Sequence, residues 1–188
     1  MHLDAPIDSL IRHARNWLVL PYITPNSSVC DIGCSENPVL LKTLSKKIAL
    51  GVGLDYSIPT CCVQQNLNFH SVDLNICPLP LTDAQFDFVT MLAVLEHLEN
   101  PHALMQECFR ILKKGGKIIL TTPAPKSQKI LEFFADLRII SHKEIYDHKH
   151  YFSKSELFNL LQQNQFTAIN IYGKAFGFNT VAIGEKKF

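Results

Sequence analysis

Apolar residues recur along this chain in two patterns that alternate from one end to the other. Short continuous apolar runs, at 29–32, 48–54 and 86–92, have the length and composition of buried strands. Between these runs, apolar residues fall at every third or fourth position, which is typical of helices that bury one face. Buried strands separated by such helices favour a parallel sheet with helices on both of its faces. The pattern therefore predicts an α/β fold, a three-layer sandwich.

Weaker signals complete the predicted sheet. Further strands are expected at 69–72, 117–121, 166–172 and 180–183, and helical stripes at 7–18, 40–44, 59–66, 104–112, 130–137 and 157–161. The last two strands are joined by a short segment that contains glycines, so they should pair antiparallel at the sheet edge. We expect a mostly parallel sheet of about seven strands with an antiparallel edge strand. No repeat or linker interrupts residues 1–188, which therefore read as a single domain.

Three helix boundaries carry local signals. Asn37 before Pro38 predicts an N-cap followed by proline at the first helical position. The glycines at 115 and 116 predict the end of the 104–112 helix. Ser153 with Glu156 has the spacing of a capping box, which predicts that a helix begins there.

Composition argues against several classes of protein. The 188 residues are 47% hydrophobic and 19% charged, as in ordinary globular domains. The net charge is only +1 and no dense basic tract occurs, so we expect no nucleic-acid partner. Apolar stretches stop short of the ~20 residues that a membrane helix needs, and the first residues lack the layout of a signal peptide. We therefore expect a cytoplasmic protein without integral membrane contact, whose oligomeric state the sequence does not indicate.

The six cysteines show no ligand spacing. None forms a C-x-x-C pair, and most lie inside apolar runs. Small reduced thiols buried in the core are the expected reading, and we expect neither a metal site nor a disulfide framework.

Acidic residues follow three successive predicted strands at the point where each strand ends. Asp31 precedes Gly33 after the first strand, Asp55 ends the second, and Asp73 ends the third. In an open parallel sheet, ligands bind beyond these carboxyl ends. A structural turn or cap would also explain each aspartate, most easily Asp73, but three acids at three neighbouring strand ends favour a ligand site.

Residues around these positions resemble the motifs of class I S-adenosylmethionine-dependent methyltransferases, and the resemblance covers nearly the whole chain. The motifs are Val29-Cys30-Asp31-Ile32-Gly33-Cys34-Ser35, Gly53-Leu54-Asp55-Tyr56-Ser57, Val72-Asp73-Leu74, Phe86 to Leu98, and Arg110 to Gly116. The later motifs are similar to those of the small-molecule, type 11-like branch. The resemblance implies a Rossmann-like fold, S-adenosyl-L-methionine as cofactor, and transfer of its methyl group to a small-molecule acceptor by in-line displacement.

The resemblance also implies roles for particular residues. Asp55 would take the ribose hydroxyls, Asp73 the adenine amino group, and Asp31 would order the turn near the cationic part of the cofactor. The cofactor-binding set is Asp31, Gly33, Ser35, Asp55, Tyr56, Asp73, Leu74, Met91 and Leu92. His97 is the candidate catalytic residue: it could act as a base, position the acceptor or contact the cofactor, and a purely structural histidine is the alternative.

One motif departs from the family pattern. Where three glycines are common, this chain has Gly33, Ser35 and Asn37. A catalytically degraded, methyltransferase-like binding module is therefore an alternative function. A second is an NAD(P)-dependent oxidoreductase, but its G-x-G-x-x-G fingerprint keeps only the first glycine here.

The segment 123–152 is expected to choose the methyl acceptor. Its candidate substrate residues are Phe133, Phe134, Tyr146, His148, His150 and Tyr151, and a solvated connector is the alternative interpretation of the last four. The helical stripe at 130–137 would pack on the core, close over the acceptor as a lid, or bind a partner or membrane surface. His148 and His150 have no companion ligands at metal spacing. The sequence does not identify the acceptor or the atom that is methylated.

Overall fold

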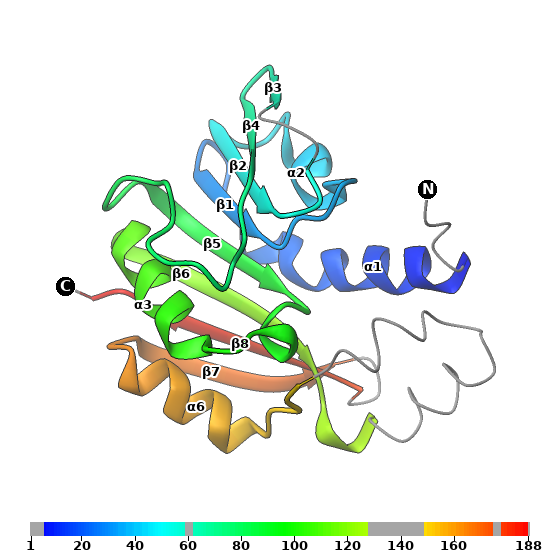
Figure 1. The fold of residues 1–188 in the computed structure, drawn as a ribbon, viewed down its shortest axis with the longest axis vertical. Helices are drawn as coiled ribbons and strands as arrows, with labels where there is room; N and C mark the ends of the chain where they lie inside the picture. The colour runs from blue at the N-terminus through cyan, green and yellow to red at the C-terminus, as the bar shows by residue number, and fades with distance from the viewer. Residues whose placement is uncertain (1–5, 59–61, 128–148, 175–177, 188) are drawn as a thin grey trace.

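The computed structural model describes residues 6–58, 62–127, 149–174 and 178–187. In this part of the chain, eight strands form one sheet in the order β3-β4-β2-β1-β5-β6-β8-β7, and Figure 1 shows them following one another across the molecule. Their bounds are β1 Ser28–Ile32, β2 Leu50–Asp55, β3 Cys62–Gln64, β4 Leu67–Ser71, β5 Phe86–Leu92, β6 Leu112–Pro123, β7 Thr167–Lys174 and β8 Asn179–Glu185.

The centre of the sheet is parallel and both of its ends are antiparallel. Strand β1 lies between β2 and β5, and β4, β2, β1, β5 and β6 all run the same way. Strand β8 pairs antiparallel with β6, and β7 pairs antiparallel with β8. The α/β fold, the mostly parallel sheet and the antiparallel C-terminal edge are confirmed. The short strand β3, antiparallel to β4, brings the number of strands to eight.

Helices cover the sheet on both faces. On one face, α1 (Pro6–Val19) and α2 (Val39–Leu44) contribute Val19, Leu40, Leu41 and Leu44 to one apolar cluster. On the other, α3 (Pro101–Ile111) and α6 (Lys154–Gln163) pack into a second cluster through residues such as Leu104 and Leu157. Three 3-10 turns, η1 (Leu20–Tyr22), η2 (Leu95–His97) and η3 (Pro125–Ser127), join these elements. None of the described helices has the length and apolar character to cross a membrane.

The helix predicted over 59–66 is wrong for residues 62–66, and residues 59–61 lie outside the described part of the chain. Residues 62–64 form β3 instead, and the chain reverses into β4 through Gln65, whose φ is +55°. The amide of Asn66 fixes this reversal by donating to the carbonyls of Ser45 and Ile48 at 2.9 and 2.7 Å. Side-chain to backbone bonds of this kind favour turns over helices.

Two of the three predicted helix boundaries are also wrong. Pro38, not Asn37, holds the N-cap position of α2, and the Asn37 side chain accepts from Lys42 instead. Helix α3 ends at Ile111, four residues before Gly115. The ammonium of Lys186 takes the place of a glycine cap there, donating to the carbonyls of Phe109, Arg110 and Leu112 at 2.7, 3.3 and 2.8 Å.

The capping box is confirmed, since Ser153 and Glu156 exchange both of its hydrogen bonds at the start of α6. Glu96 and His97 lie in η2, a separate 3-10 turn that precedes α3. The helical stripe at 130–137 falls outside the described residues.

Candidate active site

The end of β1 turns sharply toward the end of β2. Gly33 has φ +75°, and its N–H donates to the Leu54 carbonyl at 2.8 Å. The Cys34 N–H donates to the same carbonyl at 3.3 Å. A left-handed residue at this place is what reverses the chain, and glycine adopts that conformation without strain from a side chain. The turn predicted after the first strand is therefore present at the carboxyl edge of the sheet.

Asp55 holds this turn from the neighbouring strand. One carboxylate oxygen accepts the Ser35 N–H at 2.9 Å, and the other accepts the N–H and hydroxyl of Ser57 at 2.8 and 2.7 Å. Asp55 is only 9% exposed. A carboxylate has about four lone-pair sites, so room remains for a further donor. Asp55 can both shape the turn and accept from a ligand.

Asp31 is buried beneath the turn. It is 4% exposed, and its carboxylate accepts the Thr90 hydroxyl at 2.6 Å. Burial raises the pKa of Asp31 to about 7, although the bond from Thr90 opposes this effect, and the nearby Asp55 adds to it. An acid poised in this way is stabilised as a carboxylate when a cation binds beside it.

Ser35 shows how the chain departs from the glycine pattern. Its φ is +61°, a left-handed conformation that glycine adopts more easily. The residue is held there by its N–H bond to Asp55 and by the guanidinium of Arg12, which donates to the Ser35 hydroxyl at 3.3 Å. Arg12 lies on α1, so this helix reaches over the turn. Sequence reasoning missed Arg12, because nothing in a helical stripe marks an arginine that contacts a distant loop.

The loop after β5 closes against the same turn. A Cβ atom added at Gly33 would lie only 2.1 Å from Cγ2 of Val94, so these two segments are in close contact. Met91 is fully buried in the apolar cluster on the α3 side, which leaves only its backbone for a ligand. Leu92 is partly buried on the opposite face.

The remaining cofactor candidates lie at the rim of this edge. Tyr56 follows Asp55 and is 78% exposed. Asp73 is exposed and accepts the Asn75 N–H at 2.9 Å, as a turn aspartate does, while Leu74 is partly buried against the core. These three residues stay available to a ligand, but Asp73 also has the structural role that the sequence left open.

Glu96 and His97 follow directly after the β5 loop. His97 is partly buried, and its N–H donates to the Val94 carbonyl at 2.9 Å. Glu96 is 0% exposed, and burial raises the pKa of its carboxyl. A strongly buried acid at this edge was not singled out by the sequence, where it reads only as part of a motif.

The candidate acceptor residues are only partly within the described chain. His150 is exposed, with its ring 5.7 Å from that of Phe152, and Tyr151 is partly buried. Phe133, Phe134, Tyr146 and His148 lie outside the described residues. Where the chain is described, no group of three or more His, Cys, Asp or Glu residues is placed to hold a metal ion.

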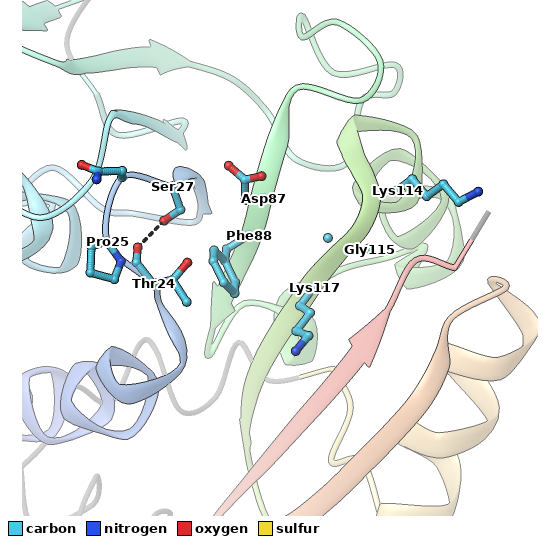
Figure 2. A pocket seen from close by; sticks show the side chains of 10 residues that line it. Thr24, Pro25, Ser27, Asp87, Phe88, Lys114, Gly115 and Lys117 are labelled. Carbon is cyan, nitrogen blue, oxygen red and sulfur yellow. Dashed lines mark hydrogen bonds between the residues drawn. The ribbon is translucent and has the colours of Figure 1, made fainter.

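A pocket of about 360 Å³ lies at the opposite edge of the sheet, where β1, β5 and β6 begin (Figure 2). Its acid, Asp87, is already paired with Lys113 at 2.9 Å and accepts from Ser28. Figure 2 shows the side chains of Lys114 and Lys117 pointing away from one another. Ligands of open parallel sheets bind at the carboxyl ends of strands, so we assign the site to the Gly33 turn and not to this pocket.

Comparisons with known proteins agree with this geometry. A family model described as a methyltransferase domain matches residues 7–171. An enzyme of Glaesserella parasuis named ubiquinone biosynthesis O-methyltransferase is 27% identical over 186 residues, covering 87% of this chain and 78% of that protein. The protein of the same name from Coxiella burnetii (strain RSA 493) is 31% identical over 124 residues, 58% of this chain and 51% of its own length.

Solved structures support the fold. An S-adenosylmethionine-dependent methyltransferase from Archaeoglobus fulgidus aligns with a TM-score of 0.72 at 18% identity, covering 94% of each chain. One from Mesorhizobium loti aligns with a TM-score of 0.70 at 15% identity, covering 93% of this chain and 99% of its own.

Proposed function

The chain belongs to the methyltransferase-domain family and is an S-adenosylmethionine-dependent methyltransferase; from this premise we propose that it methylates a small molecule by in-line displacement. The observation that carries the proposal is the turn at Gly33, clasped by Asp55 at the carboxyl edge of the sheet. This edge offers a buried acid, a second acid with spare accepting capacity, and a backbone held in a glycine-like conformation. These features fit a ligand that carries both a ribose and a positive charge.

Different residues of the site would bind different parts of the cofactor. We propose that Asp55 accepts from one ribose hydroxyl, that Asp73 and Leu74 meet the adenine, and that Asp31 faces the positively charged methionine end. Tyr56 lies exposed beside Asp55, where its ring can cover the nucleoside. The bound cofactor supplies a methyl group on a positively charged sulfur.

Positioning is the main catalytic contribution that these residues can make. Holding nucleophile, methyl carbon and sulfur in line can lower the barrier by ~7–11 kcal/mol. The tight contact between the Gly33 turn and Val94 holds the loop after β5 against the turn, and we propose that the acceptor side of the site is built on this loop. The name of the Glaesserella parasuis relative, an O-methyltransferase, supports an oxygen nucleophile. The segment 123–152 remains our candidate for acceptor choice.

Calorimetry with S-adenosylmethionine and S-adenosylhomocysteine tests the cofactor assignment. We expect both to bind, and Asp55→Ala to weaken binding by ~1–3 kcal/mol because the ribose loses its charged acceptor. Asp83→Ala is the matched control, since Asp83 is exposed and pairs with Arg110 far from the turn. Urea unfolding of each variant separates lost binding from lost structure.

Two results would count against the proposal. Wild-type protein that binds neither compound at millimolar concentration would favour the non-catalytic binding module. Binding of NADH in place of both compounds would favour an oxidoreductase.

A further inference from the structure

Buried oxygens without hydrogen-bond partners gather at the carboxyl end of the sheet. Both carboxyl oxygens of Glu96 and the hydroxyls of Thr121 and Thr122 lack a partner among the described residues. These three residues are at most 1% exposed. A buried polar group that is left without a hydrogen-bond partner destabilises the fold. Several such groups in one place therefore indicate that a ligand bonds to them in the working protein.

These oxygens lie beside the Gly33 turn. Glu96 is in η2, two residues after Val94, whose side chain abuts Gly33. Thr121 pairs in register with Leu92, the last residue of β5. Thr122 projects to the same face of β6 as the buried Leu120 and lies close enough to Glu96 to lower its pKa, without reaching hydrogen-bond geometry. Thr122 therefore lies beyond the end of β5, on the neighbouring strand away from β1, and Glu96 lies close to it.

Among the described residues, none donates a hydrogen bond to the Glu96 carboxyl. Burial raises the pKa of this carboxyl, and the charges of Arg15 on α1 and of the adjacent His97 oppose that rise only in part. The chain at Lys149 and His150 crosses over Glu96, but its N–H groups bond to the backbone carbonyl of Glu96 at 2.8 and 3.3 Å. A carboxyl kept only for structure would be expected to take such donors itself.

We propose that Glu96, with Thr122 beside it, receives the proton of a methyl acceptor whose nucleophile is a hydroxyl or an amine. This inference rests on the proposed function, because it places the acceptor at the end of β5. It also narrows the acceptor, since a nucleophile that carries no proton would need no such group. Oxygen and nitrogen acceptors share this chemistry, and the experiment separates them.

The step balances with these groups alone. The acceptor's lone pair forms the new bond to the methyl carbon as the bond from that carbon to sulfur breaks, and sulfur keeps that electron pair. The proton on the acceptor's oxygen or nitrogen passes to the Glu96 carboxylate. The positive charge of the sulfonium and the negative charge of the carboxylate both disappear, which leaves a thioether, a methylated acceptor and a carboxylic acid. No further reactant is required.

A measurement that needs no turnover tests the contact. The protein is labelled with carbon-13 at its glutamate carboxyl carbons, saturated with S-adenosylhomocysteine, and titrated with phenol, aniline or anisole. Glu96→Gln assigns the Glu96 signal. We expect phenol, aniline or both to move the Glu96 signal and its titration, while anisole, which has no proton to donate, leaves them unchanged. Phenol and aniline together identify whether oxygen or nitrogen is preferred.

Kinetics of the responding probe give the second test. Loss of a general base lowers turnover by ~10²–10⁴-fold, so Glu96→Gln should lower kcat by that factor and abolish the rise of the rate with pH. The KM for S-adenosylmethionine should stay the same. Glu99→Gln is the matched control, because its exposed carboxylate lies three residues away and pairs with Lys149. It should leave the pH profile unchanged.

The possible failures are distinct. If S-adenosylhomocysteine binds but neither phenol nor aniline moves the Glu96 signal up to its solubility limit, the inference is wrong and the proposed function stands. The inference is also overturned if anisole acts like phenol, or if Glu96→Gln keeps the wild-type pH profile. Absence of S-adenosylhomocysteine binding overturns the proposed function as well.

Discussion

The contact between Gly33 and Val94 makes a quantitative prediction about the candidate site. Gly33→Ala adds a methyl group to a residue at φ +75°, whose new Cβ would lie 2.1 Å from Val94 Cγ2. Carbon atoms in contact normally lie ~3.5–4.0 Å apart. The next nearest atoms, Cβ and Cγ1 of Val94, are at 3.4 and 3.5 Å, which is ordinary contact. A single methyl group of Val94 therefore accounts for the collision.

Two costs add in the Gly33→Ala variant. The left-handed backbone costs a residue with a side chain ~1–2 kcal/mol. The collision adds the cost of overpacking, ~1–3 kcal/mol. Combining Gly33→Ala with Val94→Ala removes Cγ2 and should recover the second cost but not the first. We therefore expect a coupling energy of ~1–3 kcal/mol between the two substitutions, such that the double variant is destabilised less than the sum of the two single variants.

Urea unfolding of the wild type, Gly33→Ala, Val94→Ala and the double variant measures the coupling. Calorimetry with S-adenosylhomocysteine measures binding in each of the four proteins. The double variant should be more stable than the sum of the single variants predicts and should regain part of the binding that Gly33→Ala loses. Strictly additive free energies of unfolding would refute the reasoning, because they would mean that Val94 does not press on the turn. Gly116→Ala is unsuitable as a control, since backbone atoms lie within 3.1 Å of its added Cβ.

Three further predictions follow from other contacts at and around the site. Burial raises the pKa of Asp31 from 3.8 to about 7, so the free energy of unfolding should fall as pH rises between these values, because the buried group must ionise. If the carboxylate is the form that binds, S-adenosylmethionine affinity should rise roughly tenfold from pH 6 to pH 8. Urea unfolding and calorimetry of Asp31→Asn should show both pH dependences flattened. Ser35→Gly should keep or improve cofactor affinity measured by calorimetry, since glycine adopts φ +61° more easily, and a large loss would assign the affinity to the contact with Arg12. Lys186→Met should lower the free energy of unfolding by ~1–3 kcal/mol in urea, because three carbonyls at the end of α3 lose their donor and the Phe109 ring loses the ammonium that lies over it. An unchanged midpoint would contradict that capping role.

Features with a strong local signal could be predicted from the sequence. The buried runs that became β1, β2 and β5 were continuous enough to specify strands, and the parallel sheet follows from their alternation with helices. The aspartates at 31 and 55 were predicted to meet at one edge, and the structure brings them together around the turn at Gly33. In each case, the information lies in a few consecutive residues.

Features that depend on distant partners could not be predicted. The end of α3 is set by Lys186, more than 70 residues further along the chain, so the glycines at 115 and 116 gave a false signal. Strand β3 forms because β4 offers it an edge and Asn66 fixes the reversal, although its own residues are also compatible with a helix. The isolation of the Glu96 carboxyl is a property of everything packed around it, and no sequence motif records what fails to bond.

The substituted glycine motif illustrates how these two kinds of information combine. Read along the chain, Ser35 in place of glycine suggests a weakened cofactor site. In three dimensions, Asp55 from β2 and Arg12 from α1 both bond to Ser35, and together they can offset the ~1–2 kcal/mol of a left-handed residue. A serine supplies a hydroxyl that accepts from Arg12, which glycine could not do. The substitution therefore loses the conformational freedom of glycine but gains a hydrogen bond to α1. Loss of a motif residue therefore argues for loss of function only where no other element has taken over its structural role.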